Sequence, residues 1–400
     1  MITAASLYAT PNALASSYSR FRVSERLLLT GHSHQAWPDC GMEGQRQAWI
    51  DAADHLDRKW EYAFAKADAV RQGFRRLLDD ADGHIALGAN THEMVVRLLS
   101  ALPLAKRPRI VTTDGEFHSL RRQLDRMAEA GLEIVKVPAT PASQVAERLI
   151  AATDDRTAVV MVSAVFYHSG EIVPALRTVL AACRRAGAHL LIDAYHALNV
   201  VPFSVRGDGL EGAFVVGGGY KYCQLGEGNA FLRFPRDCRL RPLVTGWFSE
   251  FDTLDADANQ GGVRYGKGAA RFAGATYDPT SHYRAAEVFK FFEVQGLSPE
   301  LLRQVSQHQI GLLARAFDNL DADPRLISRH RSIPLSAIGG FLALQSPSAG
   351  EICRLLRERG VHTDHRDEAI RLGPAPYLSD EQLHRCMQIL GEVVGGMSRK

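Results

Sequence analysis

The sequence predicts an α/β fold with a mostly parallel seven-stranded sheet and a second, smaller α+β domain. Two observations lead to this fold class. Up to about residue 280, short apolar runs alternate with stretches of helical periodicity, which is the pattern of repeated strand–helix–strand units. Beyond that point the pattern changes to helices and single extended pieces, with no linker rich in proline, glycine or serine between the two parts.

Seven apolar runs have the length of buried parallel strands. They are HIALG (84–88), RIVTT (109–113), EIVKV (133–137), AVVMV (158–162), HLLID (189–193), GAFVV (212–216) and AFLRF (230–234). The stretch VPALRTVLAACRRAG (173–187) is typical of the helices between them, because its apolar residues share one helical face and Gly187 is placed as a stop.

The later part of the chain predicts the smaller domain. After residue 280 we expect a long helix, an isolated strand GGFLALQ (339–345), a helix over 351–360 and a final helix over 380–394. The expected division is a large domain over 60–278 and a small domain made of 279–400 together with 1–59.

Composition and charge narrow the class of function. The chain has 400 residues, 46% hydrophobic and 23% charged, which is typical of a globular protein with a sizeable core. Its 47 basic and 45 acidic residues give a net charge of +2. Because the basic residues are scattered, we expect no nucleic acid and no membrane as partner, and a small-molecule substrate instead.

The N-terminal segment and the cysteines bear on location and metal binding. The first twenty residues lack the basic start and apolar run of a signal peptide, and no run of about 18 apolar residues occurs in the sequence, so we expect a cytoplasmic protein. The six cysteines are single and widely spaced, without a CxxC pair or zinc-ligand spacing. We expect reduced thiols and no metal site.

Asp193 and Lys221 are the most informative residues. Asp193 ends the apolar run LLID, and Lys221 follows GAFVV within the glycine-rich stretch GGGYKYCQLGEGN (217–229). Ligands of open α/β sheets bind at the carboxyl ends of strands. A lysine in apolar surroundings has a lowered pKa and a nucleophilic neutral amine. Together they suit pyridoxal phosphate, because its aldehyde reacts with the amine and its pyridine nitrogen pairs with the carboxylate.

Each of the two residues also has an ordinary structural explanation. A strand-end aspartate commonly caps the next helix, and a lysine in a glycine-rich turn is commonly a solvated tip. Their combination on neighbouring strand ends, with His196 three residues after the aspartate, favours the cofactor site.

The segments DAYH (193–196) and GGGYKYCQLGEGNAFL (217–232) resemble the aspartate and lysine segments of fold-type I pyridoxal-phosphate enzymes of the class V aminotransferase group. Within that group the chain most resembles kynureninase. Three further stretches carry the closer resemblance, which extends from about residue 80 to about residue 383: VTGWF (244–248), RFAGATYDP (271–279) and GVHTDHRDEAIRLGPAPYLSDEQL (360–383).

The resemblance implies contacts to the cofactor. Phe117 would stack on the pyridine ring, and the helix start at Asn90 and Thr91 would receive the phosphate. His196 would lie beside the ring or its O3′ oxygen. From the residues alone, a core aromatic, an ordinary helix cap and a core histidine stay open for these positions.

Three more positions receive cofactor roles from the resemblance. Tyr220 would donate to the phosphate and pass a proton to the carbanion that bond cleavage leaves. Trp247 and Thr276 would complete the phosphate site, with Thr276 reaching across the interface of a homodimer whose subunits share their active sites.

The resemblance also implies a substrate site. Arg371 in AIRLGPAP would bind the α-carboxylate, since a guanidinium pairs bidentately with a carboxylate. The alternative is a surface arginine on a strand edge, but its apolar neighbours favour an enclosed position. Within TGHSHQAWP (30–38), His32, Ser33 and His34 are candidates for the aromatic-amine end of the substrate.

The reaction implied by the resemblance is hydrolytic cleavage of the Cβ–Cγ bond of kynurenine or 3-hydroxykynurenine, a step of tryptophan catabolism that gives an anthranilate and alanine. Lys221 would release the cofactor to the substrate amine and then remove the α-proton. The chain departs from the kynureninase pattern at Leu120, where an aspartate would stand, at YHSG (167–170), and at the triplet GAT (274–276).

These departures keep other functions open. An aminotransferase, or a cysteine desulfurase or related lyase, can use the same scaffold, although 328–340 contains no cysteine for a desulfurase and Cys353 falls in a predicted helix. A non-catalytic protein that binds pyridoxal phosphate is the remaining alternative, and the joint presence of Asp193, Lys221 and Arg371 argues against it.

Overall fold

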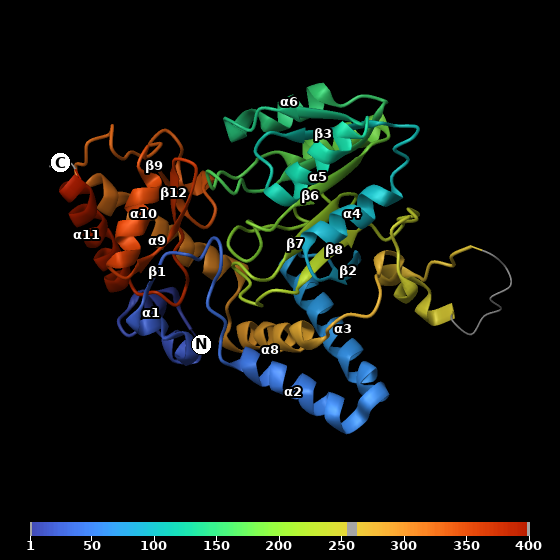
Figure 1. Cartoon of the computed structure of the whole chain (residues 1–400), viewed down its shortest axis with the longest axis horizontal. Coiled ribbons are helices and arrows are strands. Elements are labelled where there is room, and N and C mark those ends of the chain that lie inside the picture. Colours follow the sequence, from blue (N-terminus) through green and yellow to red (C-terminus); the bar gives the residue numbers. More distant parts are fainter. Residues whose placement is uncertain (1, 254–261, 398–400) are drawn as a thin grey trace.

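A seven-stranded sheet forms the centre of the computed structural model, which describes residues 2–253 and 262–397 (Figure 1). The strand order is β2-β8-β7-β6-β5-β3-β4. β8 runs antiparallel to both of its neighbours, and the other neighbouring pairs are parallel, so the predicted fold class is confirmed. The strands are β2 (His84–Gly88), β3 (Arg109–Thr113), β4 (Glu133–Val137), β5 (Thr157–Ser163), β6 (His189–Asp193), β7 (Phe214–Gly218) and β8 (Ala230–Phe234).

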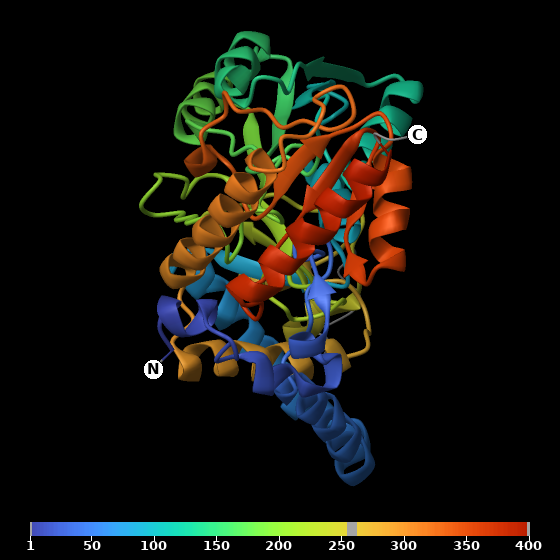
Figure 2. The same ribbon diagram turned by 90° about the vertical axis from the view of Figure 1, so that its left-hand side faces the viewer.

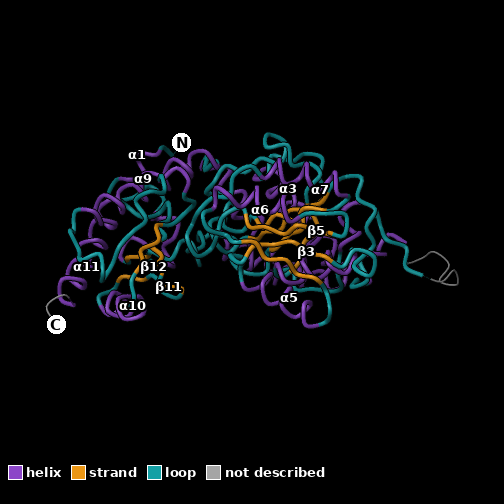
Figure 3. The backbone as a smooth tube through the Cα atoms, turned by 90° about the horizontal axis from the view of Figure 1, so that it is seen from above, coloured by secondary structure: helices purple, strands orange, loops and turns teal. Residues whose placement is uncertain are grey.

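Helices cover both faces of this sheet (Figure 3). Successive residues of β5 belong to different apolar clusters: Val160 and Val162 pack on one face, Val159 and Met161 on the other. Helices α3, α6 and α7 supply the first cluster and helices α4 and α5 the second. Their bounds are α3 (Lys59–Leu77), α4 (Thr91–Ala101), α5 (His118–Glu129), α6 (Val145–Ala152) and α7 (Leu176–Ala186).

Several predicted boundaries differ from the observed ones, and two of these differences have a clear cause in the backbone. Helix α7 begins at Leu176 and not at 173, because Ile172 is bridged to Val165 as extended chain and Ala175 has a left-handed backbone with φ of 60°. It ends at Gly187 as predicted, with φ of 68°. Strand β7 begins two residues later than predicted and includes two glycines, which a pattern of apolar residues does not mark as strand.

The chain after residue 279 builds a second layer of structure beside the sheet. The predicted long helix is two helices, because Gly296 adopts φ of 71° and Pro299 starts a new helix. The strand predicted to be isolated is paired, since β9 joins an antiparallel sheet in the order β11-β12-β9. The elements are α8 (Thr280–Gln295), α9 (Pro299–Asp318), β9 (Leu342–Gln345), α10 (Ala349–Glu358), β10 (Val361–His362), β11 (Asp364–Arg366), β12 (Ala369–Leu372) and α11 (Asp380–Met397).

The N-terminal residues pack against this later part. Strand β1 (Leu27–Leu28) pairs in parallel with β10, and helix α1 (Ala4–Tyr8) contacts α9, which lies beside α11 (Figure 2). Helix α2 (Cys40–His55) packs along α8, and its far end projects with the start of α3 as an arm (Figures 1 and 2). The expected domain division at 278/279 falls just before α8 and stays a prediction. Short 3-10 helices span Ala15–Phe21, Val23–Glu25, Leu56–Arg58, Ala142–Gln144, Trp247–Thr253, Gly268–Phe272 and Leu335–Ala337.

The described part of the chain bears on two expectations from the sequence, the absence of a membrane span and the absence of a metal site. Within residues 2–253 and 262–397, the helices are too short or too polar to cross a membrane. The six cysteines are free thiols, and four of them are buried. The same residues contain no cluster of three or more histidine, cysteine or acidic side chains that could hold a metal ion.

Candidate active site

Lys221 lies in the turn after β7, with its side chain enclosed by aromatic rings. Only 5% of its surface is exposed. Its Nζ lies 5.1 Å from the ring centre of Phe117, 4.8 Å from that of Tyr195 and 5.6 Å from that of Tyr220. Burial lowers the pKa of Lys221 to about 7, because desolvation disfavours the ammonium form more than the nearby Asp193 carboxylate favours it. Much of the amine is therefore neutral and nucleophilic at neutral pH.

Glycines let this turn pack closely against its surroundings. A Cβ atom on Gly218 would lie 2.5 Å from the hydroxyl of Tyr195, and one on Gly219 would lie 2.6 Å from the Cβ of Leu225. A side chain at either position would push the turn away from its neighbours. The run of three glycines before Tyr220 is therefore a packing requirement of the site.

His196 is the direct hydrogen-bond partner of the lysine. The distance from Lys221 Nζ to His196 Nε2 is 2.7 Å. Burial, and next the charge of Lys221, hold the pKa of His196 well below its usual range, so the imidazole is neutral. With Nε2 accepting from the amine, we assign the ring proton to Nδ1, which is buried and has no hydrogen-bond partner among the residues that the structure describes.

Asp193 ends β6 at the same edge of the sheet. Its Oδ1 accepts a hydrogen bond of 2.9 Å from the backbone N–H of Tyr195. Burial raises the pKa of Asp193, and the charge of Lys221 opposes that rise. Asp193 is thus a buried carboxylate beside a buried amine, as the sequence predicts for the two strand ends.

A cavity of about 280 Å³ opens next to these groups. Phe117 and Tyr167 meet edge to face on its wall, with ring centres 5.3 Å apart, so the wall offers a flat aromatic surface. The cavity is lined by Ala89, Asn90, Thr91, His92, Phe117, Ser119, Ser163, Val165, Tyr167, Asp193, Tyr195, His196, Tyr220, Lys221, Glu227 and Gly228.

The start of helix α4 forms one end of the cavity. Asn90 caps the helix, and its Oδ1 accepts a hydrogen bond of 3.0 Å from the N–H of Glu93. The side chain of Asn90 is therefore an ordinary cap, which was the alternative left open by the sequence. Thr91 is the first helical residue and lines the cavity, so the helix directs its positive end toward this space.

The residues present fit pyridoxal phosphate. The cavity brings together a nucleophilic amine at Lys221, a buried carboxylate at Asp193, an aromatic face at Phe117 and a helix start for an anion. The unpartnered Nδ1 of His196 adds a buried donor that a bound molecule can satisfy. The pocket around Lys221 is therefore a site for pyridoxal phosphate.

Two residues predicted to contact the cofactor lie elsewhere within the protomer. The indole Nε1 of Trp247 donates to the hydroxyl of Thr276 at 3.2 Å, and both side chains are exposed. Neither lines the cavity beside Lys221. A contact from Thr276 to the cofactor would have to come from a second subunit, and that role stays a prediction.

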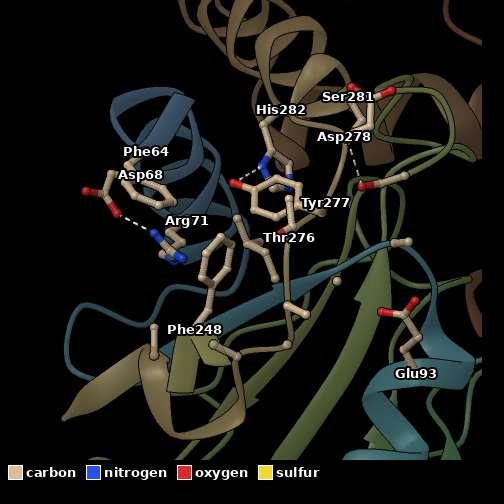
Figure 4. Close-up of a pocket in the computed structure, with 18 of the residues that line it drawn as sticks. Phe64, Asp68, Arg71, Glu93, Phe248, Thr276, Tyr277, Asp278, Ser281 and His282 are labelled. Atoms are coloured by element: carbon tan, nitrogen blue, oxygen red, sulfur yellow. Dashed lines mark hydrogen bonds and ion pairs between the residues drawn. The ribbon is translucent and has the colours of Figure 1, made fainter. Parts of the chain in front are cut away.

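Thr276 lines a larger cavity of about 930 Å³, which adjoins the first one at Ala89, Glu227 and Gly228. Figure 4 shows aromatic and charged side chains around it, with Arg71 paired to Asp68. The smaller cavity is the better candidate for catalysis, because the nucleophilic amine and the buried carboxylate line that cavity and not the larger one.

The predicted substrate residues take three different positions. Arg371 on β12 is 3% exposed and pairs bidentately with Asp364, at 2.9 Å from Nε to Oδ1 and 2.6 Å from Nη2 to Oδ2. His32 contacts the same carboxylate, with Nε2 2.7 Å from Asp364 Oδ1. The hydroxyl of Ser33 donates to the carbonyl of Thr30 within its own turn.

His34 contacts a residue that lines the cofactor pocket. Its ring stacks on Tyr220, with ring centres 5.1 Å apart. The bridge between Thr30 and Gly373 holds the segment 30–34 beside the end of β12. His34 thus lies against Tyr220, while His32 contacts the Asp364–Arg371 pair.

Three polar residues of the site are not among those predicted from the sequence. Ser163 ends β5 opposite Asp193, so the strand-end rule that found the aspartate could have found it. Glu116 is buried behind Ser163, which donates to it from its hydroxyl at 2.6 Å, and burial raises the pKa of Glu116 to about 7. Asp364 faces Arg371 in a two-residue hairpin, and the segment DHRDEAIR carried that signal.

Comparisons with known proteins support the resemblance to kynureninase and pyridoxal phosphate as the cofactor. A family model described as the kynureninase C-terminal domain matches residues 303–390. A kynureninase of Burkholderia pseudomallei is 28% identical over 379 residues, which are 88% of this chain and 84% of that protein. An uncharacterised aminotransferase of Bacillus subtilis, YcbU, is 22% identical over 348 residues, which are 85% of this chain and 87% of that protein.

Solved structures share the fold. The cystine C-S lyase C-DES in complex with cysteine persulfide has a TM-score of 0.79 at 16% identity and covers 92% of this chain and 98% of its own. A cysteine desulfurase from Thermococcus onnurineus NA1 has a TM-score of 0.76 at 17% identity, over 93% of this chain and 95% of its own. A variant of C-DES carries glycine covalently linked to its pyridoxal-phosphate cofactor. The chain is therefore kynureninase-like in sequence and has the fold of the fold-type I pyridoxal-phosphate enzymes.

Proposed function

We propose that this kynureninase-like chain cleaves the Cβ–Cγ bond of kynurenine or 3-hydroxykynurenine with water, giving an anthranilate and alanine. The observation that carries the proposal is the position of Arg371, which lies in the segment matched by the kynureninase C-terminal family model and is buried close to the lysine pocket. A buried guanidinium beside an amine-binding pocket suits a substrate with an α-carboxylate.

Lys221 is the proton-transfer group of the proposed reaction. Pyridoxal phosphate, when bound, supplies the electron sink that lets bonds at the substrate's α- and β-carbons break. The Lys221 amine would take the proton from the substrate's α-carbon, because its pKa of about 7 keeps much of it neutral. His196 holds the amine by the hydrogen bond of 2.7 Å.

Tyr220 is placed to return a proton. The centre of its ring lies 5.6 Å from Lys221 Nζ, and the residue lines the same cavity. Burial, together with the charges of Asp193 and Glu227, raises the pKa of Tyr220, so the hydroxyl keeps its proton at physiological pH. Tyr220 therefore acts as an acid toward the carbon that the departing acyl group leaves behind.

A second candidate function is transamination, which the similarity to the Bacillus subtilis aminotransferase over 85% of this chain favours. A desulfurase is disfavoured by the thiols. A desulfurase needs a reactive thiolate. Cys353 is buried in α10, and burial raises its pKa to about 12. Cys223, two residues from Lys221, is 1% exposed, and burial also raises its pKa.

We further propose a homodimer in which Thr276 serves the partner's site. Apolar side chains near Thr276 are exposed, among them Trp247, which bonds to Thr276, and Phe251, which packs against Trp247. Mixing Lys221→Ala subunits with Thr276→Ala subunits tests this arrangement. If each site takes Lys221 from one subunit and Thr276 from the other, a mixed dimer has both changes in one active site and neither change in the other. Activity restored in the mixture supports it, and no restored activity contradicts it.

Product analysis tests the proposed reaction. The purified protein, loaded with pyridoxal phosphate, is incubated with L-kynurenine or L-3-hydroxykynurenine, and products are identified by mass spectrometry. Equal amounts of the anthranilate and alanine are expected, and Lys221→Ala as the matched control is expected to give neither. Formation of an amino acid from an added 2-oxo acid, without an anthranilate, would replace the proposal with transamination.

A further inference from the structure

Arg371 and Asp364 are direct cross-strand partners. They face each other in the antiparallel pair β11–β12, and two hydrogen bonds join one edge of the guanidinium to the carboxylate. The third bond runs from Arg371 Nη1 to the backbone carbonyl of Tyr167 at 2.9 Å. Tyr167 lines the cavity beside Lys221, so this bond ties the arginine to the wall of the cofactor site.

The remaining donors of Arg371 match a carboxylate. A guanidinium has five N–H donors, one on Nε and two on each terminal nitrogen. Three are used, through Nε, Nη1 and Nη2, so each terminal nitrogen keeps one. Two donors on adjacent nitrogens form the fork that binds a carboxylate with two parallel bonds. Asp364 therefore occupies Nε and only one donor of Nη2, and the Tyr167 carbonyl occupies one donor of Nη1.

We propose that Asp364, held in turn by His32, is a positioning residue that presents the terminal fork of Arg371 to the α-carboxylate of the substrate. The inference rests on the proposed function in requiring an amino-acid substrate, but not on the bond that is cleaved. In this arrangement His32 acts on Arg371 through Asp364 and does not bind the aromatic end of the substrate.

His32 is suited to hold Asp364 as a neutral donor. Its side chain is fully buried, and its Nε2 lies 2.7 Å from Asp364 Oδ1. Burial lowers the pKa of His32 to about 4, with the Asp364 contact opposing the shift, so the ring is neutral at physiological pH and donates from Nε2–H. Phe341 packs against both His32 and Arg371, with His32 5.0 Å and the guanidinium 5.8 Å from its ring centre.

The local charges preserve the attraction of the fork for an anion. His32 and Arg371 hold the pKa of Asp364 below its usual range, so it stays a carboxylate. Arg366 lies 3.7 Å from the same carboxylate. Two guanidinium charges thus face one carboxylate and a neutral imidazole, which leaves this group one positive charge in excess.

The opposite possibility is that Asp364 blocks the arginine and competes with the substrate. The two mechanisms predict opposite effects of removing the charge of Asp364. If Asp364 competes with the substrate, removing its charge tightens the binding of the substrate carboxylate to Arg371. If Asp364 positions Arg371, removing its charge weakens that binding, because an arginine side chain that Asp364 no longer holds loses more conformational freedom when the substrate binds.

Calorimetric titration of the protein loaded with pyridoxal phosphate tests the inference. The ligands are L-alanine and ethylamine, which differ by the carboxylate. Asp364→Asn is expected to weaken L-alanine binding about tenfold and to leave ethylamine within about twofold of wild type. His32→Gln, which keeps the carboxylate and alters its support, is expected to act in the same direction with a smaller factor.

Asp367→Asn is the matched control, because Asp367 lies in the same hairpin with its side chain 88% exposed and does not contact Arg371. It is expected to change neither affinity. Unchanged or tighter L-alanine binding in Asp364→Asn would overturn the inference, as would equal weakening of both ligands. If Asp364→Asn does not fold, His32→Gln decides by the same criteria. Selective loss of L-alanine binding without any cleavage of kynurenine would keep the positioning role and refute the proposed reaction.

Discussion

Lys221 carries an energetic cost that its replacement by methionine is expected to remove. The pKa of the amine falls from an ordinary 10.5 to about 7 because the side chain is buried. The unfolded chain holds this proton up to pH 10.5, while the folded chain releases it near pH 7. The folded state is therefore penalised fully below pH 7, and the penalty fades as the pH rises toward 10.5.

The size of the effect follows from this shift. With about 1.4 kcal/mol for each pKa unit, the penalty is about 4 kcal/mol at pH 7 and about 2 kcal/mol at pH 9. The assay is guanidinium unfolding of the cofactor-free wild type and Lys221→Met at both pH values. The stability gained by the variant is expected to shrink by about 2 kcal/mol between pH 7 and pH 9.

The control for this measurement is Lys106→Met, which removes an exposed lysine. Its difference from wild type is expected to stay the same at both pH values. A Lys221→Met difference that is equally independent of pH would refute the reasoning, because it would mean that the folded protein keeps Lys221 protonated like a lysine in water.

Two further outcomes concern buried charges. Burial raises the pKa of Glu116 from 4.5 to about 7. Wild type is therefore expected to lose about 3 kcal/mol of stability relative to Glu116→Gln as the pH rises from 4.5 to 7, measured by thermal melting. Curves of stability against pH that run parallel for the two proteins would contradict this. Asp80→Ala leaves the buried Arg233 without its carboxylate and is expected to cost about 3–5 kcal/mol. Asp323→Ala, which removes the partner of the exposed Arg325, is expected to cost far less stability than Asp80→Ala, and equal costs would contradict this reasoning.

The sheet and the position of the cofactor site could be predicted because they depend on local patterns. Five of the seven predicted strands have the observed bounds, since each apolar run is short and ends in polar or small residues. Asp193 and Lys221 were found because neighbouring parallel strands bring their carboxyl ends to one edge. The sequence reasoning could not place the helix break at Gly296, because a single glycine inside a helical pattern is ambiguous.

Contacts between distant segments account for most of what was missed. The His32–Asp364 contact joins residues 332 positions apart, and no local pattern brings them together. The pairing of Asp364 with Arg371, only seven residues apart, was within reach of a hairpin argument. Sequence proximity groups Ser33 with His32, but the hydroxyl of Ser33 donates a hydrogen bond to the carbonyl of Thr30 within the same turn.

Borohydride reduction followed by peptide mass mapping tests the central claim most directly. The claim is that the cavity beside Lys221 holds pyridoxal phosphate through this amine. After loading and reduction, the peptide that contains Lys221 is expected to carry the reduced cofactor in stoichiometric amount, and Asp193→Asn is expected to hold the cofactor less tightly. Labelling of other lysines, or a Lys221 peptide without added mass, would contradict the assignment of the site.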